Sequence, residues 1–323
     1  MSAPGSANPP AVVLSRALRP RGAAVRAWAG LIRFIRTKKL GGMALLLCVV
    51  VILIGILAPW IVPYDKDEPF TAPNPKFDIN SVEPEALNAT TLARLEGPTR
   101  DHWLGTDDKG RDLLTRMVLG ARISLTVGIA SAALATVLGA IIGLVSGYFG
   151  GLVDLVVQRI VDGLIAIPSL VLLLLLVQVG DPSLRLTIIA LSVLGTFTAS
   201  RVVRAATLSV RNDVYIDAAR AVGATPPRIM VRHVLPNIAA PMIIIFTISI
   251  GSNILAEAGL AFLNLGVPGP SWGQMVNQGR SFLDSKPLMS LAAGGAITAT
   301  VLGFNLLGDA LRDVLDPRQR GSR

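Results

Sequence analysis

Long apolar blocks without a single charged residue alternate with polar segments along this chain. Six of these charge-free blocks are candidate membrane spans: Leu40–Tyr64, Ile123–Val153, Gly163–Gly180, Leu186–Ser200, Val234–Ala256 and Pro287–Gly308. A spanning helix needs about 20 mostly apolar residues, and a charge at the centre of the bilayer costs roughly 2.5–3.5 kcal/mol. The pattern therefore predicts an all-α, polytopic membrane protein with six transmembrane helices.

Three of the blocks depart from a simple span. The second is longer than one span, and the glycine-rich stretch from Gly147 to Gly151 is a natural place for its helix to end. The third contains Pro168, the one candidate break within the spans. The fourth is short and has to extend toward Arg201, whose long side chain can reach the membrane interface.

Composition agrees with a membrane protein. Only 16% of the 323 residues are charged and the mean hydropathy is +0.60, whereas a soluble domain carries about 25% charged residues. Cys48 is the only cysteine, and His102 and His233 are far apart in sequence, so neither a disulfide framework nor a metal site is expected. The first block is too long for a signal peptide and 39 residues precede it, which indicates an uncleaved span.

Basic residues gather on one side of the expected topology. Residues 1–39 hold eight Lys/Arg and no acid, and the loop 201–233 holds six Lys/Arg against two acids. With the N-terminus in the cytoplasm, the net charge is +12 on the cytoplasmic side and −3 outside, as the positive-inside rule requires. Both termini and the loop 201–233 should then be cytoplasmic, with 65–122 outside. Basic charge confined to such loops also argues against nucleic acid as a partner.

The spans divide the chain into five segments. Residues 1–39 should be a basic cytoplasmic region, with a disordered tail over 1–11 and an amphipathic helix over 12–39 that lies on the inner leaflet. A merely solvated basic tail is the alternative; in the helical case Trp28 and Phe34 would be the interfacial anchors. The other segments are the first transmembrane helix, the extracytoplasmic segment, a core with transmembrane helices 2–6, and a cytoplasmic C-terminal tail, at 40–64, 65–122, 123–308 and 309–323.

Small residues recur at every fourth position in the second block. They form a continuous stripe on one helix face: Ser131, Ala135, Gly139, Gly143 and Gly147. The sixth block repeats the pattern more weakly with Gly295, Ala299 and Gly303. In lipid, such stripes let two helix backbones approach closely, so van der Waals contacts stabilise the pair. Both stripes predict tight helix packing and carry no chemistry.

Ionisable residues are absent from the middle of all six blocks. Proton- or sodium-driven transporters usually carry such groups or broken helices at the midplane, so the energy for any transport should come from another chain. The segment Gly105–Asp112 has the spacing of a phosphate-binding loop, but Arg111 and Asp112 replace the Lys and Ser/Thr that such a loop needs. No paired carboxylates or nucleophile–base pair lies in or near a block, which disfavours an enzyme.

The loop after the fourth block has strong helix signals. Asp213 can cap a short helix that runs through Val222, and Gly223 supplies its stop. Thr225 can cap a second helix with Pro226 at its first position, where a missing N–H costs nothing. A plain connector needs no such arrangement, so this helix, glycine hinge and helix predict a docking surface.

The same loop resembles the EAA motif of permeases in binding-protein-dependent ABC importers. Asp217-Ala218-Ala219 is followed after three residues by Gly223, and after nine more by His233-x-Leu235-Pro236. Asp217 replaces the usual Glu and His233 stands where Ile is common. The resemblance implies that the helix fits a cleft on a separate ATPase subunit. Ala218, Ala219 and Gly223 would then form the docking helix and hinge, with Asp217 and Arg220 making polar contacts at its rim.

Further motifs point to one subfamily. Residues 102–128, the stretch Arg159…Asp162…Pro168, and residues 260–275 and 308–318 resemble the dipeptide/oligopeptide/nickel permease family, in particular its C-type member. The resemblance implies a type I ABC importer permease fold in the bacterial cytoplasmic membrane. It also implies a B-type permease as heterodimer partner, two ATPase domains that carry ATP and magnesium, and an extracytoplasmic binding protein or lipoprotein. No cofactor is expected on this chain.

The resemblance also gives roles to the outer segments and to the cargo. Trp272 and the turn from Pro268 to Pro270 would shape the mouth that faces the binding protein, or would simply be rigid connectors between spans. Peptides are the family's commonest cargo, with nickel, glutathione or another small solute as alternatives. A stand-alone secondary transporter or channel remains the second hypothesis, and a membrane-embedded enzyme the third.

Overall fold

The computed structural model describes residue 35 and residues 38–73 and 90–315. Apart from Ile35, Lys38 and Lys39, the amphipathic helix and tail expected at the N-terminus lie outside the described residues, as do Trp28 and Phe34. The described residues are almost entirely helical. They include one pair of short antiparallel strands, β1 (Thr71–Pro73) and β2 (Thr90–Leu92), with Thr71 opposite Leu92.

Five described helices are long and apolar enough to cross a membrane. These helices are α2 (Lys39–Ile61), α3 (Leu113–Phe149), α6 (Leu184–Val210), α10 (Ala239–Phe262) and α12 (Leu288–Leu315). A sixth span is a bent pair, α4 (Gly151–Ile165) and α5 (Ser169–Val177), whose axes differ by 86°. Five of the six predicted spans are therefore present as single helices, and the third corresponds to the bent pair, which makes six if the pair crosses as one broken span.

The break in the third span falls at Pro168. Its φ and ψ are −52° and 127°, so the chain leaves the helical conformation there and the block Gly163–Gly180 is not one helix. Proline has no N–H to donate, and its ring disfavours a helical conformation at the residue before it. A charge-free block read as one span therefore hides a turn, with most of α4 lying before the block begins.

Two other spans are longer than their charge-free blocks. Helix α3 begins at Leu113 rather than Ile123, where the carboxylate of Asp112 accepts a 2.7 Å hydrogen bond from the N–H of Thr115. Its 37 residues make a rod of about 55 Å, well beyond a hydrocarbon core of about 30 Å. Helix α6 likewise continues past Arg201 to Val210. Arginine ends a charge-free block without ending a helix, since it is a good helix former.

Glu257 is an acidic residue near the end of the fifth span, just beyond its charge-free block. The fifth block ends at Ala256 because this glutamate follows, but α10 continues to Phe262. The side chain of Glu257 is completely buried in the bundle, at 0% exposure. The Ser124 hydroxyl of α3 donates a 3.0 Å hydrogen bond to its Oε2. Glu257 thus joins α10 to α3 within the protein rather than facing lipid.

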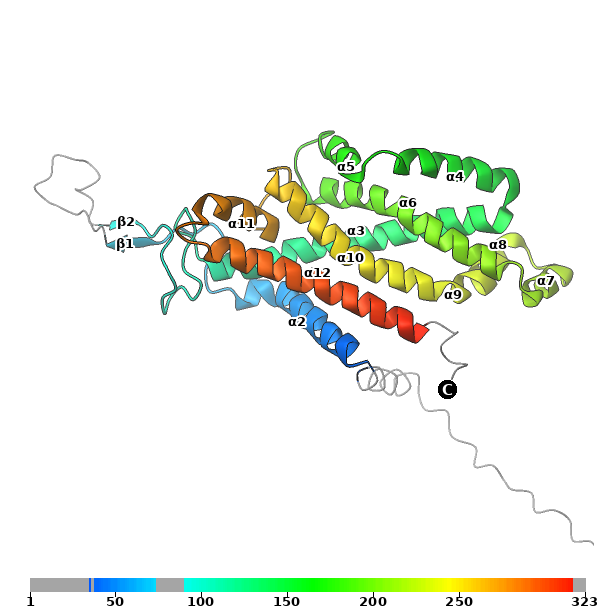
Figure 1. Ribbon diagram of the computed structural model, residues 1–323, viewed down its shortest axis with the longest axis horizontal. Coiled ribbons are helices and arrows are strands. Elements are labelled where there is room, and N and C mark those ends of the chain that lie inside the picture. Colours follow the sequence, from blue (N-terminus) through cyan, green and yellow to red (C-terminus); the bar gives the residue numbers. More distant parts are fainter. Residues whose placement is uncertain (1–34, 36–37, 74–89, 316–323) are drawn as a thin grey trace, which may run out of the picture.

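The helices pack as an elongated bundle (Figure 1). Helix α3 lies along α6 and also contacts α10, while α12 packs between α2 and α10. The start of α2 and the end of α12 lie at one end of the bundle, and Lys38 there makes a 2.7 Å ion pair with Asp313. The connections between α6 and α10 reach the same end. The strands and α11 (Trp272–Gly279), which is followed by η2 (Arg280–Phe282), lie at the opposite end.

Candidate functional site

The loop between α6 and α10 forms the candidate site, which we call the coupling segment (residues 211–238). It contains α7 (Val214–Ala221), α8 (Pro226–Ile229), the π-helical turn η1 (Met230–Val234) and α9 (Leu235–Asn237). Helix α7 starts after Asp213, as the sequence predicts. Neither Asp213 nor Thr225 makes a capping hydrogen bond through its side chain to the described residues, so the two predicted caps act through backbone conformation alone.

Gly223 ends α7 in a left-handed conformation, with φ at +82°. The N–H of Gly223 donates to the carbonyl of Arg220 at 2.9 Å, and the N–H of Ala224 to that of Ala219 at 3.0 Å. These two bonds satisfy carbonyls that the end of a helix leaves free. Nothing lies within 4 Å of a Cβ built at Gly223, so the glycine is required for its backbone conformation rather than for space.

The second half of the coupling segment runs into α10 without an intervening loop. At Leu235 the N–H bonds to the carbonyl of Met230, five residues back, which defines the π-helical turn. Pro236 explains the wide turn, since its ring would crowd the carbonyl four residues earlier in a regular α-helix. The amide of Asn237 donates to the His233 carbonyl at 2.6 Å. The coupling segment and the span α10 are thereby joined by nearly continuous helix.

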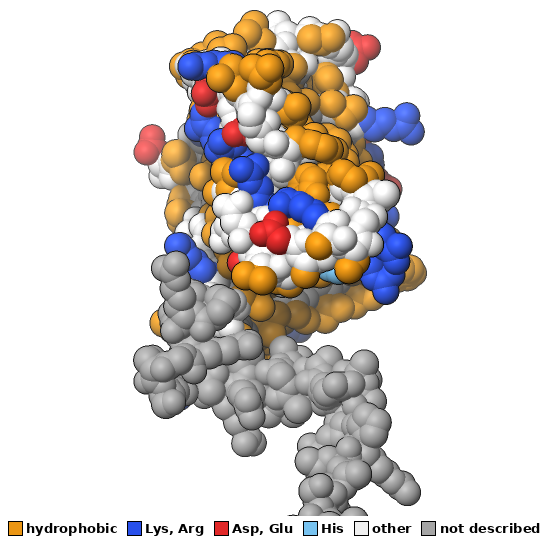
Figure 2. Space-filling view, turned by 90° about the vertical axis from the view of Figure 1, so that its right-hand side faces the viewer, with side chains coloured by type: hydrophobic (Ala, Val, Ile, Leu, Met, Phe, Trp, Pro, Cys, Tyr) orange, Lys and Arg blue, Asp and Glu red, His pale blue; other side chains and the backbone are white. Residues whose placement is uncertain are grey.

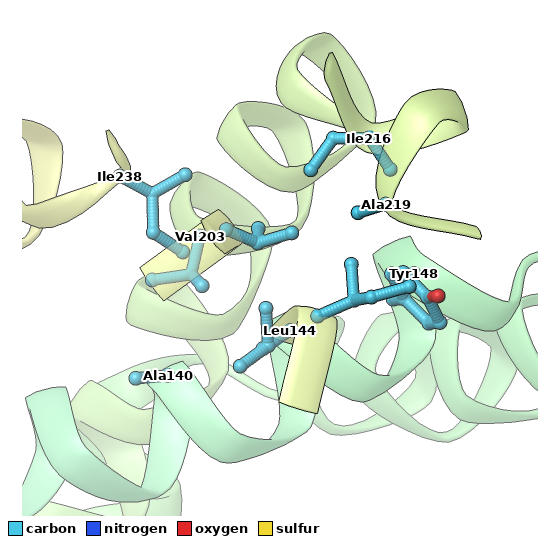
Figure 3. Close-up of a cluster of buried hydrophobic side chains, with 9 residues drawn as sticks. Ala140, Leu144, Tyr148, Val203, Ile216, Ala219 and Ile238 are labelled. Atoms are coloured by element: carbon cyan, nitrogen blue, oxygen red, sulfur yellow. The ribbon is translucent and has the colours of Figure 1, made fainter. Parts of the chain in front are cut away.

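The inner face of α7 packs onto the bundle (Figure 3). Ile216 and Ala219 are buried and point toward Leu144 and Tyr148 of α3, with Val203 of α6 in the same cluster. The cluster is completed by residues from α3 and from the second half of the coupling segment: Ala140, Ile229, Val234 and Ile238. Ala219 thus belongs to the protein's own core. Its place in the predicted docking helix is therefore on the inner face, because the helix period turns it inward with Ile216.

The outer face of α7 is apolar and uncovered in the described part of the chain. Val214 and Val222 are each 84% exposed, and Ala218 lies between them at the same four-residue spacing. Asp217 and Arg220 flank this face and form a 2.9 Å ion pair with each other. Together, Val214, Ala218 and Val222 form an exposed apolar strip along the helix. Sequence analysis missed Val214 and Val222, although their spacing from Ala218 was visible.

Arginines tie the coupling segment to the end of α3. Arg211 donates to the Gly147 carbonyl at 2.8 Å, and the Arg220 guanidinium lies 5.6 Å from the centre of the Tyr148 ring. A cation near the C-terminus of a helix is favourable because free carbonyls gather there. Figure 2 looks onto this end of the bundle and shows basic side chains among apolar ones.

Tyr215 lies beside the outer face of α7, and its phenol stays neutral. Partial burial, and then the charge of Asp213, raise the pKa of its phenol above the usual value. The uncharged form therefore persists through the physiological range. Tyr215 thus adds a neutral hydroxyl to the flank of α7 rather than a charge.

The stripe on α3 lies directly against α6. A Cβ built at Gly139 would be 2.5 Å from the Cβ of Ala199, and one at Gly143 would be 2.8 Å from the Arg204 nitrogen. Gly147 faces Thr207 in the same way, and Ala135 faces Gly195. The structure thus brings the sequence-predicted stripe together with one partner helix.

The stripe expected on the last span makes no continuous contact with the described residues. No atom of those residues lies within 4 Å of a Cβ built at Gly295, and Ala299 is only partly buried. Gly303 does meet another helix, with Leu47 and Cys48 of α2 at 3.1 and 3.3 Å from a built Cβ. The buried face of α12 passes instead through Ala293, Ile297 and Thr300, so three small residues at a four-residue spacing do not guarantee a continuous contact.

The expected outer mouth also needs correction. Trp272 is only 3% exposed, and its indole donates to the carbonyl of Met117 in α3 at 3.0 Å. Pro270 is buried beside it, whereas Pro268 is exposed. Gly120 makes room for the indole, since a Cβ there would lie 3.0 Å from the ring. Trp272 therefore anchors α11 to α3, which favours the alternative of a rigid connector at this residue, and Pro268 lies at the surface.

A cavity that the sequence did not predict opens beside α5, α6 and α10. Its volume is about 580 Å³, within the range of roughly 300–1,000 Å³ typical of small-molecule sites. Leucines and isoleucines make up about half of the wall, and its polar side chains are Ser169, Thr198, Ser249, Ser252 and Asn253. No charged residue lines it. The cavity suits a neutral or zwitterionic solute, because its polar groups are uncharged and can form hydrogen bonds with such a solute.

Comparison with known proteins gives a consistent family. Residues 117–321 match the family described as "Binding-protein-dependent transport system inner membrane component". Among relatives, a dipeptide transport system permease protein of Alkalihalophilus pseudofirmus is 38% identical, covering 92% of each chain. An oligopeptide transport system permease protein of Bacillus subtilis is 36% identical, covering 91% of this chain and 90% of its own.

Two further comparisons extend this picture. A glutathione transport system permease protein of Pectobacterium atrosepticum is 35% identical, covering 88% of this chain and 89% of its own. Among solved structures, the inward-facing MetNI methionine ABC transporter matches with a TM-score of 0.53 and 22% identity, over 63% of this chain and 98% of the other. This last likeness concerns the fold alone.

Proposed function

Since the chain belongs to the family of binding-protein-dependent transport system inner membrane components, we propose that it is the translocating subunit of a peptide importer driven by separate ATPase subunits. The exposed apolar face of α7 carries this proposal. Val214, Ala218 and Val222 present a small apolar ridge that a cleft on a partner can enclose. Burying two exposed valines contributes roughly 1.5–3 kcal/mol each, enough to position a subunit if polar contacts at the rim add to it.

The contacts beneath α7 would carry motion from the ATPase to the spans. Ile216 and Ala219 pack on α3 and α6, so a displacement of α7 pushes on both helices at once. The second half of the coupling segment continues through Pro236 into α10. Three helices therefore respond to a single docking helix, and two of them, α6 and α10, wall the 580 Å³ cavity.

The orientation follows from charge and from the arrangement of the ends. Lys38, Asp313 and the coupling segment lie at one end of the bundle, which is also the basic end of the chain by residue count. We place this end in the cytoplasm, as the positive-inside rule requires. The strands and α11 would then face the extracytoplasmic binding protein, with Pro268 at the exposed surface there.

The open side of the cavity suggests where a second permease would sit. Leu170 and Leu175 of α5 are 55% and 61% exposed, and the cavity is lined by one side of α5, α6 and α10 only. A B-type permease packed over this side would complete a pathway between two subunits. The chain itself holds no nucleotide; ATP and magnesium would be bound by the partner ATPase domains.

Peptides are the cargo that best fits the relatives and the cavity. Serine, threonine and asparagine side chains can hydrogen-bond to peptide groups of any sequence, and the wall has no charge to select one. Dipeptide and oligopeptide permeases are among the similar proteins. Glutathione is the second candidate, since a glutathione permease is also similar.

A pair of valine variants tests the proposal. Val222→Asp places a charge on the apolar face of α7, whereas Val179→Asp does so at an equally exposed valine, 82% against 84%, at the end of α5. We expect Val222→Asp to insert normally but to lose copurifying ATPase subunits and peptide uptake. Val179→Asp should keep the ATPase subunits. Equal copurification by both variants would contradict docking through α7.

A further inference from the structure

An apolar trough lies between α2 and α3 on the outside of the bundle. Its volume is about 540 Å³, and it is distinct from the cavity beside α5 and α10. Most of its lining is aliphatic, with one cation and one exposed indole: Ile52, Gly55, Ile56, Trp60, Arg122, Leu125, Thr126, Ile129 and Ala130. No carboxylate lines it.

The trough runs along the two helices within one leaflet of the membrane. Helices α2 and α3 run in opposite directions, and Gly55 of α2 lies level with Arg122 of α3, because a Cβ built at Gly55 would be 3.6 Å from the Arg122 Cα. On α3 the trough extends over eight residues, from Arg122 to Ala130, which is about 12 Å. Half of the hydrocarbon core is about 15 Å. The trough therefore has the length of the hydrocarbon depth of a single leaflet.

The floor of the trough is sealed by close helix packing. A Cβ built at Gly55 would lie 2.8 Å from the Leu125 side chain, and Leu125 is only 5% exposed. On the rim, Ile56 is 59% exposed and faces the surroundings of the bundle. A bilayer would have to fill such a channel, because its apolar walls have no favourable contact with water.

Arg122 stands at the outer end without a partner among the described residues. Its side chain is exposed, and its guanidinium makes no ion pair or hydrogen bond to any described group. The hydroxyl of Thr126 is already used, since it donates to the Arg122 carbonyl at 2.6 Å. Trp60, 77% exposed, follows Gly55 by five residues on α2, about 7.5 Å farther along the helix. Tryptophan favours the headgroup level of a membrane, and the long side chain of Arg122 can extend toward that level.

We propose that the α2–α3 trough binds a phospholipid of the outer leaflet, with an acyl chain along the apolar wall and the phosphate against Arg122. A guanidinium group can donate two parallel hydrogen bonds to two oxygens of one phosphate. A single carbonyl or ester oxygen cannot accept both bonds in this geometry. The trough is long enough for an acyl chain, and no carboxylate among the described residues lines it to repel a phosphate. The position of Arg122 then places the headgroup at the outer end. The site does not depend on the cargo or on ATPase docking.

Native mass spectrometry of the purified, assembled complex tests the site. The probes are phosphatidylglycerol, diacylglycerol with the same acyl chains, and glycerol 3-phosphate. We expect retention of phosphatidylglycerol to fall about fivefold in Arg122→Gln, the effect of one cation at a membrane surface. Arg122→Lys should recover most of it. Arg100→Gln, which removes another exposed outer arginine, should retain phosphatidylglycerol as the unsubstituted complex does.

Several outcomes would overturn the proposal. Equal retention by Arg122→Gln and the unsubstituted complex would remove the role of the cation, and equal loss in Arg100→Gln would indicate a general charge effect. Equal retention of diacylglycerol would reduce the site to apolar filling, and full competition by glycerol 3-phosphate would indicate a site for free phosphate. A disulfide cross-link from Ala130→Cys to a neighbouring subunit would show that protein covers the trough.

Discussion

The contact between α3 and α6 gives a quantitative prediction at Gly143. A Cβ at this position would lie 2.8 Å from the Arg204 nitrogen and 2.9 Å from the Val203 Cβ, whereas ordinary contacts begin near 3.4 Å. The Ser200 carbonyl oxygen would be closer still, so the two helices would have to separate by well over half an ångström along a contact in which Gly139 and Gly147 are also tight. Overpacking of this kind typically costs 1–3 kcal/mol.

Gly295→Ala is the matched control for Gly143→Ala. Both substitutions replace a helical glycine and gain about 1 kcal/mol of helix propensity, but nothing lies within 4 Å of a Cβ at Gly295. The difference between the two variants therefore isolates the helix contact. A substitution at Ala140 would be a poor control, because Ala140 is only 6% exposed within the core beneath α7.

Thermal unfolding of the purified complex measures this difference. Gly143→Ala should unfold several degrees below Gly295→Ala, given about 2–4 °C per kcal/mol for a domain of 150–250 residues. Gly143→Leu should reduce the yield of assembled complex further. The same unfolding temperature for both alanine variants would refute the close approach of α3 and α6.

The remaining predictions concern the hinge, the topology and the buried acid. Gly223→Val should abolish coupled transport while Gly223→Asn, which tolerates a left-handed backbone, keeps most of it; equal uptake would contradict the need for positive φ. With Cys48 replaced, an impermeant thiol reagent on whole cells should label Arg100→Cys but not Thr225→Cys, and the reverse would invert the topology. Glu257→Ala should unfold at a lower temperature than Glu257→Gln, because it orphans a buried hydroxyl at about 1–3 kcal/mol; equal unfolding temperatures would contradict that bond.

The existence of the spans could be predicted from sequence because it depends on composition alone. A bilayer excludes charge from any helix that crosses it, whatever the helix packs against. Span ends were less predictable, since Arg116, Arg122 and Arg204 are compatible with helix and lie inside α3 and α6. The break at Pro168 was visible as a candidate, but its 86° bend depends on how α4 and α5 pack.

The sequence did not show which candidate site residues are buried and which are exposed. Ala219 and Trp272 look like surface residues of a motif, yet both face the protein interior. The helical period could have distinguished the two alanines, because Ala219 shares a face with Ile216 whereas Ala218 shares a face with Val222. Nothing in the sequence could have shown that the indole of Trp272 reaches Met117, since that contact joins segments far apart in the chain.

Stimulated ATP hydrolysis by the reconstituted complex tests the coupling role most directly. Ala218→Trp enlarges the exposed face of α7 without entering the core that holds Ile216 and Ala219. We predict that the variant chain inserts and folds as before, while ATP hydrolysis no longer rises when loaded binding protein is added. Full stimulation of the Ala218→Trp complex would contradict docking through α7, and would favour a chain that transports without an ATPase.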